Sequence, residues 1–464
     1  MGSALSKNKN AAAAATFFAF MFLQYVVLRF GNQAGRGFLS DAVQENVYRF
    51  IQIAAVIGFL SFAPVFRLIK SSSGKTAAAL CGLGVFFCGS VLMFFFAESS
   101  AFYLAVTFLT VFALGFTGAG VYLKMASYAG SGVRIGICTG AACTAATALQ
   151  YFLQLHRLYK IPLGIFMLVS FSILGFVFSG GFQTSFQREG KEEPSPARPL
   201  VFALIIAFAM MLFTGYYNGY IHHLQIASGY SEYNVYTWPR LCMIPGFLLF
   251  GALGDLKKGR FLPLATLCVS ALALMNAVLA GQSDAYLLNM CLFYIAISAV
   301  VSYYDLTFFR LAAKTKRPAL WAPAGRVLDS LTVLFVWAFD VSSLSAAAVL
   351  AINIAALTAI LLLMALNGDL DFSSKPVSSA LPPAPEENGT ADVFETVRNR
   401  YGLTPSELKV FRELVLTEDK QTAIADRLSI KIRTVQANVT SIYRKTGVST
   451  RSGLVAVYHD SNRK

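Results

Sequence analysis

Long apolar segments separated by short polar stretches recur along the first 366 residues of the chain. Each segment is long enough to cross about 30 Å of hydrocarbon as an α-helix, which takes roughly 20 predominantly apolar residues. The pattern therefore predicts an all-α bundle of twelve transmembrane helices, over residues 11–28, 48–69, 76–97, 101–123, 134–155, 161–180, 199–219, 236–256, 261–281, 285–309, 322–340 and 343–366. The polar stretch 183–198 is the longest loop in the middle and divides the spans six plus six.

Composition agrees with a lipid environment for this part of the chain. Hydrophobic residues make up 56% of the sequence and charged residues only 13%, which excludes an ordinary soluble domain, where about a quarter of the residues are charged. The formal net charge of +14 fits a protein whose exposed parts meet anionic lipid or nucleic acid. All seven cysteines lie in apolar runs without a metal-ligand spacing, so we expect packing residues and neither a metal site nor a cofactor.

Lysine and arginine are unevenly divided between the loops on the two sides of the membrane. They are concentrated on the side of the N-terminus, for example at Lys70, Lys75, Lys257, Lys258 and Arg260. The positive-inside rule then places both termini in the cytoplasm. The first apolar run ends without a signal-type cleavage site, so we expect it to remain as the first span of a multi-pass membrane protein.

The two halves share features of an internal duplication. Residues 58–62 (GFLSF) at the end of the second span are echoed by residues 246–250 (GFLLF) at the end of the eighth. The stretch 251–260 (GALGDLKKGR) that follows closely resembles the loop signature of the major facilitator superfamily. This resemblance implies a major-facilitator-like fold, with Asp255 and the basic residues forming a latch with helix ends. In the first half Arg67 stands where that Asp would be, so the usual first-half signature is lost.

Hydropathy falls abruptly after residue 366. Residues 367–397 are rich in Pro, Ser, Gly and acidic residues, which predicts a flexible linker with a reach of about 30 Å. Helical periodicity returns in the tail 398–464, where Thr404 and Glu407 form a capping box and Gly447 is a C-cap. We therefore predict a transmembrane sensor domain over 1–366 and a C-terminal four-helix helix-turn-helix domain, with helices from Pro405 and over 421–428, 432–446 and 451–458.

The tail resembles the DNA-binding helix-turn-helix of the LuxR family, also known from NarL-type regulators, along its whole length. The resemblance rests on LTPSE at 403–407, AIADRL at 423–428, RTV at 433–435 and IYRKTGV at 442–448. It implies that the third helix enters the major groove of double-stranded DNA and that the domain pairs as a homodimer through the fourth helix. The DNA-binding residues implied are Gln436, Ala437 and Thr440 toward the bases, Lys431, Thr434, Arg444 and Lys445 toward phosphates, and Arg433 beside them.

Two positions of this helix depart from the family. The family commonly has Lys at the position of Gln436 and His at that of Asn438. Fewer cations therefore face the groove, and we expect weak binding by a single tail, with specificity that depends on pairing. A four-helix adaptor that binds protein instead of DNA is the alternative interpretation of the tail.

Polar side chains inside the spans are costly and tend to mark sites, although a hydrogen bond between helices or an interfacial aromatic belt also explains each one singly. They include Gln24, Gln52, Gln150, Gln154, Tyr236, Trp238, Tyr303, Tyr304, Asp305, Arg326 and Asp329. Arg326 and Asp329 are three residues apart and can pair with each other. The densest group is the expected wall of a pocket for an anionic or phenolic ligand, made of Tyr216, Tyr217, Asn218, Tyr220, His222, His223 and Arg240.

The whole arrangement resembles the membrane-spanning LuxR-type regulators of gut Actinobacteria. By that resemblance the chain is a transcriptional regulator in the bacterial inner membrane, which senses an unknown small molecule and controls nearby genes. A major-facilitator-type transporter with a regulatory tail is the rival hypothesis, with Asp305 and Asp329 as a conceivable proton route. An enzyme is disfavoured, because the sequence offers no nucleophile and base at a useful spacing, no phosphate loop and no metal set.

Overall fold

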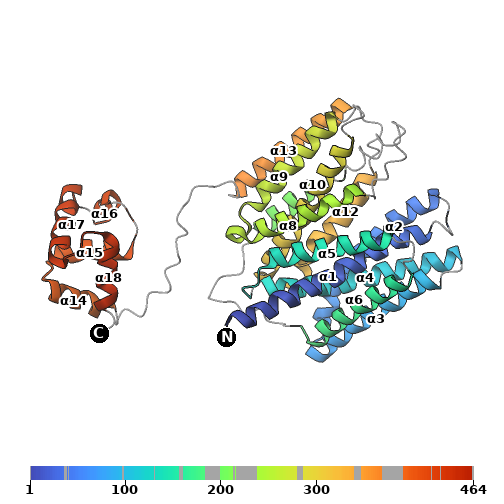
Figure 1. The fold of residues 1–464 in the computed structure, drawn as a ribbon, viewed down its shortest axis with the longest axis horizontal. Coiled ribbons are helices and arrows are strands. Elements are labelled where there is room, and N and C mark those ends of the chain that lie inside the picture. The colour runs from blue at the N-terminus through green and yellow to red at the C-terminus, as the bar shows by residue number, and fades with distance from the viewer. Residues whose placement is uncertain are drawn as a thin grey trace. The chain divides into compact units, whose positions relative to one another are not determined.

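The structure, a computed structural model of the chain, divides into two compact units, Met1–Asp371 and Phe372–Lys464 (Figure 1). Each unit has a hydrophobic core of its own. The residues that the structure describes are 2–35, 39, 41–96, 99–129, 131–155, 160–182, 199–212, 215, 238–279, 286–338, 346–367, 390–417, 419, 421–428 and 430–461.

Six consecutive helices form the first half of the first unit. They are α1 (Gly2–Gly35), α2 (Asp41–Leu68), α3 (Ser72–Phe95), α4 (Ser100–Ala129), α5 (Ile135–Leu155) and α6 (Lys160–Ser179). Long apolar sequences adopt helices in lipid because a helix satisfies all of its backbone hydrogen bonds internally. The start of α3 is fixed locally by Ser71, whose hydroxyl accepts a hydrogen bond from the backbone N–H of Gly74 at 3.1 Å.

The second half of this unit is also helical. An apolar helix over Pro199–Leu212 opens it. It continues with η1 (Trp238–Cys242), α8 (Met243–Asp255), η2 (Leu256–Gly259), α9 (Leu262–Leu279), α10 (Tyr286–Ala313), α11 (Pro318–Trp321), α12 (Ala324–Ala338) and α13 (Ala346–Asn367).

The number of membrane spans is confirmed only in part. Within the described residues, eight helices are long and apolar enough to cross a membrane, and three further apolar helices are shorter. A multi-pass membrane protein is thereby supported. The count of twelve is not confirmed, because several predicted spans, such as 199–219 and 343–366, run into residues outside the described ones.

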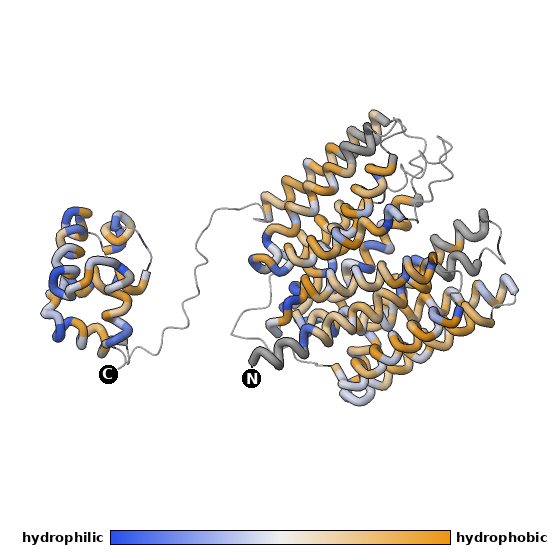
Figure 2. Tube along the Cα trace, viewed as in Figure 1, coloured by the Kyte–Doolittle hydropathy of each residue, from blue (hydrophilic) through white to orange (hydrophobic). Residues whose placement is uncertain are grey.

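The helices of the first unit are apolar along most of their length (Figure 2), and part of this apolar surface is exposed. On α6 the exposed fraction is 78% for Ile161 and 82% for Phe176, whereas Thr110 on α4 and Gln150 on α5 are completely buried. Large exposed apolar surfaces of this kind are suited to lipid tails, and polar groups in such proteins gather between the helices.

The two halves touch where α5 packs against α8, through glycines. A Cβ atom on Gly140 would lie 2.4 Å from the carbonyl oxygen of Phe247, and one on Gly251 would lie 2.6 Å from that of Gly136. Gly136 and Gly140 have the four-residue spacing of small residues that lets helix backbones approach closely in membranes. Neither Gly140 nor Gly251 leaves room for a larger side chain.

Five short helices make up the described residues of the second unit: α14 (Thr390–Tyr401), α15 (Pro405–Leu416), α16 (Gln421–Leu428), α17 (Ile432–Thr446) and α18 (Arg451–Ser461). Its core draws a buried side chain from each of them, for example Phe394, Phe411, Ile424, Ile442 and Leu454. The predicted caps are present: Thr404 and Glu407 form a reciprocal capping box, and Gly447 ends α17 in the left-handed conformation with φ of 72°.

Helix α14 lies across the end of the predicted linker. The Phe394 ring packs against the Tyr458 ring of α18, with centroids 4.9 Å apart, and Val397 is fully buried. The described part of the unit therefore has five helices where the sequence pattern predicts four, and its folded part begins before residue 398. Val393, Phe394, Val397 and Tyr401 recur at helical spacing in α14, so the sequence carried a helical signal that the linker prediction did not use.

The contact between α5 and α8 predicts that Gly140→Ala destabilises the first unit. The added methyl group would force the helix backbones apart, which should cost about 1–3 kcal/mol. Thermal unfolding of the purified full chain in detergent measures the loss. Gly84→Ala on α3 is the matched control, because a Cβ there would meet no atom within 4 Å. An unchanged unfolding temperature for Gly140→Ala would contradict the close packing of these helices.

Candidate functional site

Asp255, the last residue of α8, connects the second half to the first. Its carboxylate accepts hydrogen bonds from the backbone N–H groups of Gly136 and Ile137, both at 2.8 Å. These groups belong to the first turn of α5, where unsatisfied N–H donors and the helix dipole favour a negative charge. The Arg310 guanidinium donates to the same carboxylate at 3.4 Å. The predicted contact of Asp255 with a helix end is therefore present, and we call these contacts the Asp255 latch.

The corresponding end of the first half is built differently. Arg67 is exposed, and the adjacent Phe66 packs against Phe62 and Phe182, with ring centroids 4.5 and 4.9 Å away. The Lys75 ammonium lies 5.6 Å from the centroid of the Phe66 ring. An aromatic cluster with a cation thus occupies the place where the usual loop signature would put a carboxylate.

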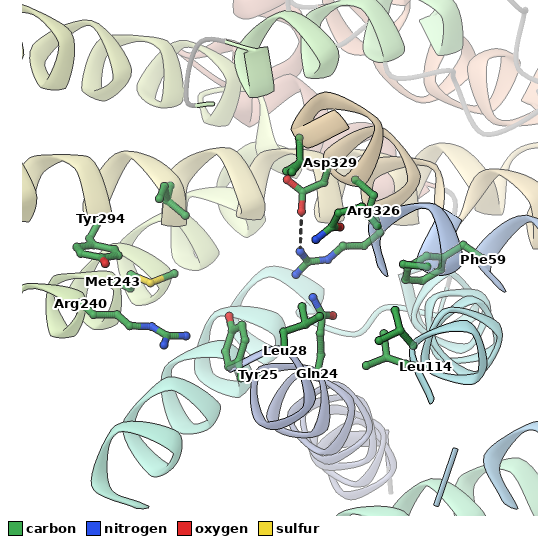
Figure 3. A pocket seen from close by; sticks show the side chains of 16 residues that line it. Gln24, Tyr25, Leu28, Phe59, Leu114, Arg240, Met243, Tyr294, Arg326 and Asp329 are labelled. Carbon is green, nitrogen blue, oxygen red and sulfur yellow. Dashed lines mark hydrogen bonds and ion pairs between the residues drawn. The ribbon is translucent and has the colours of Figure 1, made fainter. Parts of the chain in front are cut away.

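A cavity of about 290 Å³ lies between the two halves of the first unit (Figure 3). It is lined by Gln24, Tyr25, Leu28, Gln52, Ala55, Phe59, Val111, Leu114, Arg240, Met243, Tyr294, Ile297, Arg326, Asp329, Ser330 and Val333. Helix α8 begins beside the cavity at Met243 and ends at Asp255, a rise of about 18 Å. The cavity and the Asp255 latch therefore lie at different levels of the bundle.

A polar network crosses between the halves beside this cavity. The Arg326 guanidinium on α12 donates through Nε to the Tyr122 hydroxyl on α4 at 2.8 Å, and that hydroxyl donates to the Asp305 carboxylate on α10 at 2.9 Å. Arg326 also donates to Asp329 at 3.1 Å, which confirms the predicted pair. Tyr122, Asp305 and Arg326 are buried. Buried charges are stable only when they are paired and hydrogen-bonded, so this network favours the observed arrangement of the two halves.

Two further polar side chains of the cavity have few partners. The Arg240 guanidinium lies 5.4 Å from the centroid of the Tyr25 ring, a cation–π contact. Within the described part of the chain, no carboxylate lies within ion-pair distance of Arg240. The amide oxygen of Gln24 is buried and has no hydrogen-bond partner among the described residues.

The sequence located this cavity only in part. Arg240, which we expected in the pocket wall, does line it. Tyr216, Tyr217, Asn218, Tyr220, His222 and His223 lie outside the described residues. Tyr25 and Tyr122 were missed. Gln24 and Gln52 were recognised only as single polar residues within spans, and Arg326 and Asp329 as a pair on one helix. A polar residue within an apolar span is the sequence signal that these four residues share.

The second unit presents one polar face of α17. Val435, Val439 and Ile442 form its buried stripe. The predicted DNA-binding residues that are exposed are Lys431, Arg433, Thr434, Gln436, Ala437, Thr440 and Arg444. Lys445 differs, because its ammonium donates to the Glu407 carboxylate at 2.7 Å and to the Gly402 carbonyl at 2.9 Å. These bonds attach the end of α17 to the start of α15, which gives Lys445 a structural role in this arrangement.

The Glu407 carboxyl is the most strongly perturbed acid of this unit. Burial by itself raises its pKa, but hydrogen bonds from Lys445, Ser441 and Thr404 outweigh burial and hold the pKa at about 2. The carboxylate is therefore charged at neutral pH, and it joins the capping box of α15 to the last turn of α17.

Comparison with known proteins identifies the fold of the first unit. No protein-family model matches the chain, and no curated protein sequence matches it. The crystal structure of a Major Facilitator Superfamily transporter, FucP, in the outward conformation shares 13% sequence identity with a TM-score of 0.52, over 77% of this chain and 98% of that one. The crystal structure of the human organic anion transporter MFSD10 (TETRAN) shares 15% identity with a TM-score of 0.47, over the same shares of the two chains. The likeness to FucP shows that the chain contains a major-facilitator-like membrane fold.

The lowered pKa of Glu407 predicts that the second unit loses stability as the pH falls from about 4.5 to about 2. A carboxyl whose pKa is lowered by folding stabilises the folded state above its unfolded pKa, and this stabilisation disappears as the pH falls through the folded pKa. Glu407→Gln should lower the unfolding free energy at pH 7 by about 1–3 kcal/mol and flatten this pH dependence. Urea unfolding of the fragment 372–464, followed by circular dichroism, measures both.

Glu395→Gln is the control for this measurement. Glu395 pairs with Arg398 on the surface of α14 at 3.2 Å, and its side chain is 52% exposed, so its loss should change stability little. If Glu407→Gln and the unaltered fragment show the same pH profile, the Lys445–Glu407 contact does not stabilise the fold.

Proposed function

We propose that the chain is a membrane-bound, DNA-binding transcriptional regulator of the LuxR type, which binds a small molecule in its major-facilitator-like unit. The observation that carries this proposal is the exposed polar face of α17 on a compact unit of its own. A helix that buries one apolar stripe and presents amide, hydroxyl and cationic groups on its other face has the chemistry that major-groove recognition requires.

In this proposal Gln436, Ala437 and Thr440 face the bases. A glutamine amide can pair with both hydrogen-bonding groups of adenine, and the alanine and threonine methyl groups can contact a thymine methyl. Lys431 and Arg444, at opposite ends of α17, would hold phosphates and set the register of the helix. Arg433 and Thr434 are exposed in the first turn and would support Lys431, whereas Lys445 would act through its bond to Glu407.

The cellular arrangement follows from the same proposal. DNA binding requires the C-terminal unit to lie in the cytoplasm, on the inner face of a bacterial inner membrane, and the loop charges support that orientation. Two copies would pair through α18 on adjacent half-sites, because one unit offers few cations to the groove.

Ligand control would act through the relative position of the two halves. The cavity is lined by helices of both halves, and both the Asp255 latch and the Arg326–Tyr122–Asp305 network bridge them. A ligand that prefers one arrangement of the halves shifts the equilibrium by the ratio of its two affinities. The shift would pair or release the C-terminal units and so change DNA occupancy.

A transporter is the second candidate, and the comparisons with solved structures favour it. FucP, whose fold resembles that of the first unit, is a transporter, and its match covers 77% of this chain. The buried Asp305 beside Arg326 is also the type of residue that marks proton relays in transporters. The first half lacks the carboxylate of the usual loop signature and has Arg67 and an aromatic cluster there instead. The loss of this latch favours a sensor.

The proposal predicts two different effects of substitutions in α17. In a dimer of the fragment 372–464, Gln436→Ala should weaken the free energy of binding to the preferred DNA sequence by about 1–3 kcal/mol. It should also reduce the preference for that sequence over others. Lys431→Ala should weaken binding about equally on all sequences and reduce its salt dependence. Gel shift or fluorescence anisotropy on the DNA upstream of the gene measures both.

Arg398→Ala, a basic residue on α14, is the matched control and should change DNA binding little. If Gln436→Ala leaves the preference unchanged while Lys431→Ala alters it, the proposed orientation of α17 is wrong. If the paired fragment ignores duplex DNA at low salt, the regulator proposal itself is wrong.

The two candidates differ in uptake by vesicles. For a regulator we expect vesicles that contain the full chain to accumulate no more radiolabelled 3-phenylpropionate, a small organic anion, than empty vesicles. Accumulation that a protonophore abolishes, and that Asp305→Asn removes while leaving the chain folded, would favour the transporter.

A further inference from the structure

The polar groups of the cavity are divided between two sides. In Figure 3 the Arg240 guanidinium lies on one side, next to Tyr25, and the Arg326–Asp329 pair and the Gln24 amide lie on the other. A cavity with opposite polarities on its two sides selects the orientation of a bound molecule as well as its charge.

On the first side, the Arg240 guanidinium has no ion pair within the described part of the chain. It lies against the Tyr25 ring in a cation–π contact. A guanidinium presents several N–H donors in one plane, which matches a carboxylate bound by two parallel hydrogen bonds. This side of the cavity is therefore suited to the anionic end of a ligand.

On the second side, the described carboxylates outnumber the described cations. The single guanidinium of Arg326 serves two carboxylates, Asp329 directly and Asp305 through the Tyr122 hydroxyl. The Asp329 side chain is 41% exposed, and the buried Gln24 amide oxygen has no hydrogen-bond partner among the residues that the structure describes. A second anionic group would be repelled here, whereas a hydroxyl or ammonium group would gain acceptors.

The rest of the lining is mainly apolar and aromatic. It includes Tyr25, Leu28, Phe59, Leu114 and Met243. A volume of about 290 Å³ lies at the lower end of the range for pockets that hold drug-sized molecules. The occupant is accordingly small, with an apolar body about the size of one ring.

We propose that the cavity binds a small molecule with a carboxylate at one end, a ring-sized apolar body, and a hydrogen-bond donor at the other end. Arg240 holds the carboxylate, and Gln24 and Asp329 accept from the donor. This inference rests on the proposed function, in which the cavity is the ligand site. It adds the chemical class of the ligand and the direction in which it lies.

Three probes test the two ends separately: 3-(4-hydroxyphenyl)propionate, its carboxamide, and 3-phenylpropionate. Binding to the purified full chain in lipid nanodiscs is measured by calorimetry. The carboxamide should bind at least about tenfold more weakly than the acid, because it cannot pair with Arg240. The acid without the hydroxyl should bind about 3- to 10-fold more weakly, because the acceptors of the second side stay unpaired.

Two variants assign these differences to their side chains. Arg240→Gln should remove the preference for the acid over the carboxamide, and Gln24→Leu should reduce the preference for the hydroxyl while keeping the preference for the acid. Arg134→Gln is the matched control, because Arg134 is exposed at the start of α5, at the level of the Asp255 latch. The three probes on the unaltered chain remain a complete test if a variant fails to fold.

The inference is overturned if the carboxamide binds as tightly as the acid, if Arg240→Gln keeps the preference, or if none of the three probes binds. These outcomes leave the DNA-binding proposal standing, because that assay uses the isolated C-terminal fragment without a ligand. Conversely, the fragment could fail to bind DNA while the full chain binds the hydroxylated acid selectively. That result would support this ligand class and show that the regulator proposal is wrong.

Discussion

Hydrocarbon offers no hydrogen-bonding partner to a peptide group, and the architecture of the first unit depends on this constraint. Each span must satisfy its own backbone as a helix, and neighbouring helices can then recognise one another only through shape and a few polar groups. The contact of α5 with α8 uses both. Gly140 and Gly251 allow the backbones to meet, and Asp255 accepts the free N–H groups at the start of α5. The junction between the halves is thereby specific without a large polar interface.

The same constraint explains why the Arg326–Tyr122–Asp305 network matters for either proposed activity. Charges buried between helices are kept only where they pair, and Arg326, Tyr122 and Asp305 pair across the two halves beside the cavity. A molecule that enters the cavity meets side chains from both halves and competes with, or adds to, these pairs. A sensor and a transporter share this requirement, and they differ in whether the resulting movement reaches DNA or carries the ligand across the membrane.

The second unit obeys the rules of a water-soluble domain. Its short helices depend on caps, on a shared core and on bonds between helix ends, such as Lys445 to Glu407 and Gly402. Because Val435, Val439 and Ile442 form the buried stripe of α17, its opposite face, which includes Gln436, Ala437 and Thr440, is exposed to a partner. The cationic, amide and hydroxyl groups there are the basis of the DNA-binding proposal.

Sequence alone determined the features that arise from local periodicity and local chemistry. These are the apolar helices of the first unit, the capping box at Thr404, the cap at Gly447 and the pairing of Arg326 with Asp329. The tertiary structure decided which distant residues meet: Tyr122 with Asp305, Gln24 and Tyr25 with Arg240 around one cavity, and Phe394 of α14 with the core of the second unit. The physical reason is that helix periodicity repeats within a few residues, whereas a cavity or a buried ion pair depends on how helices far apart in the chain are placed. A polar residue in an apolar span signals that it needs a partner, but only the packed bundle determines which one.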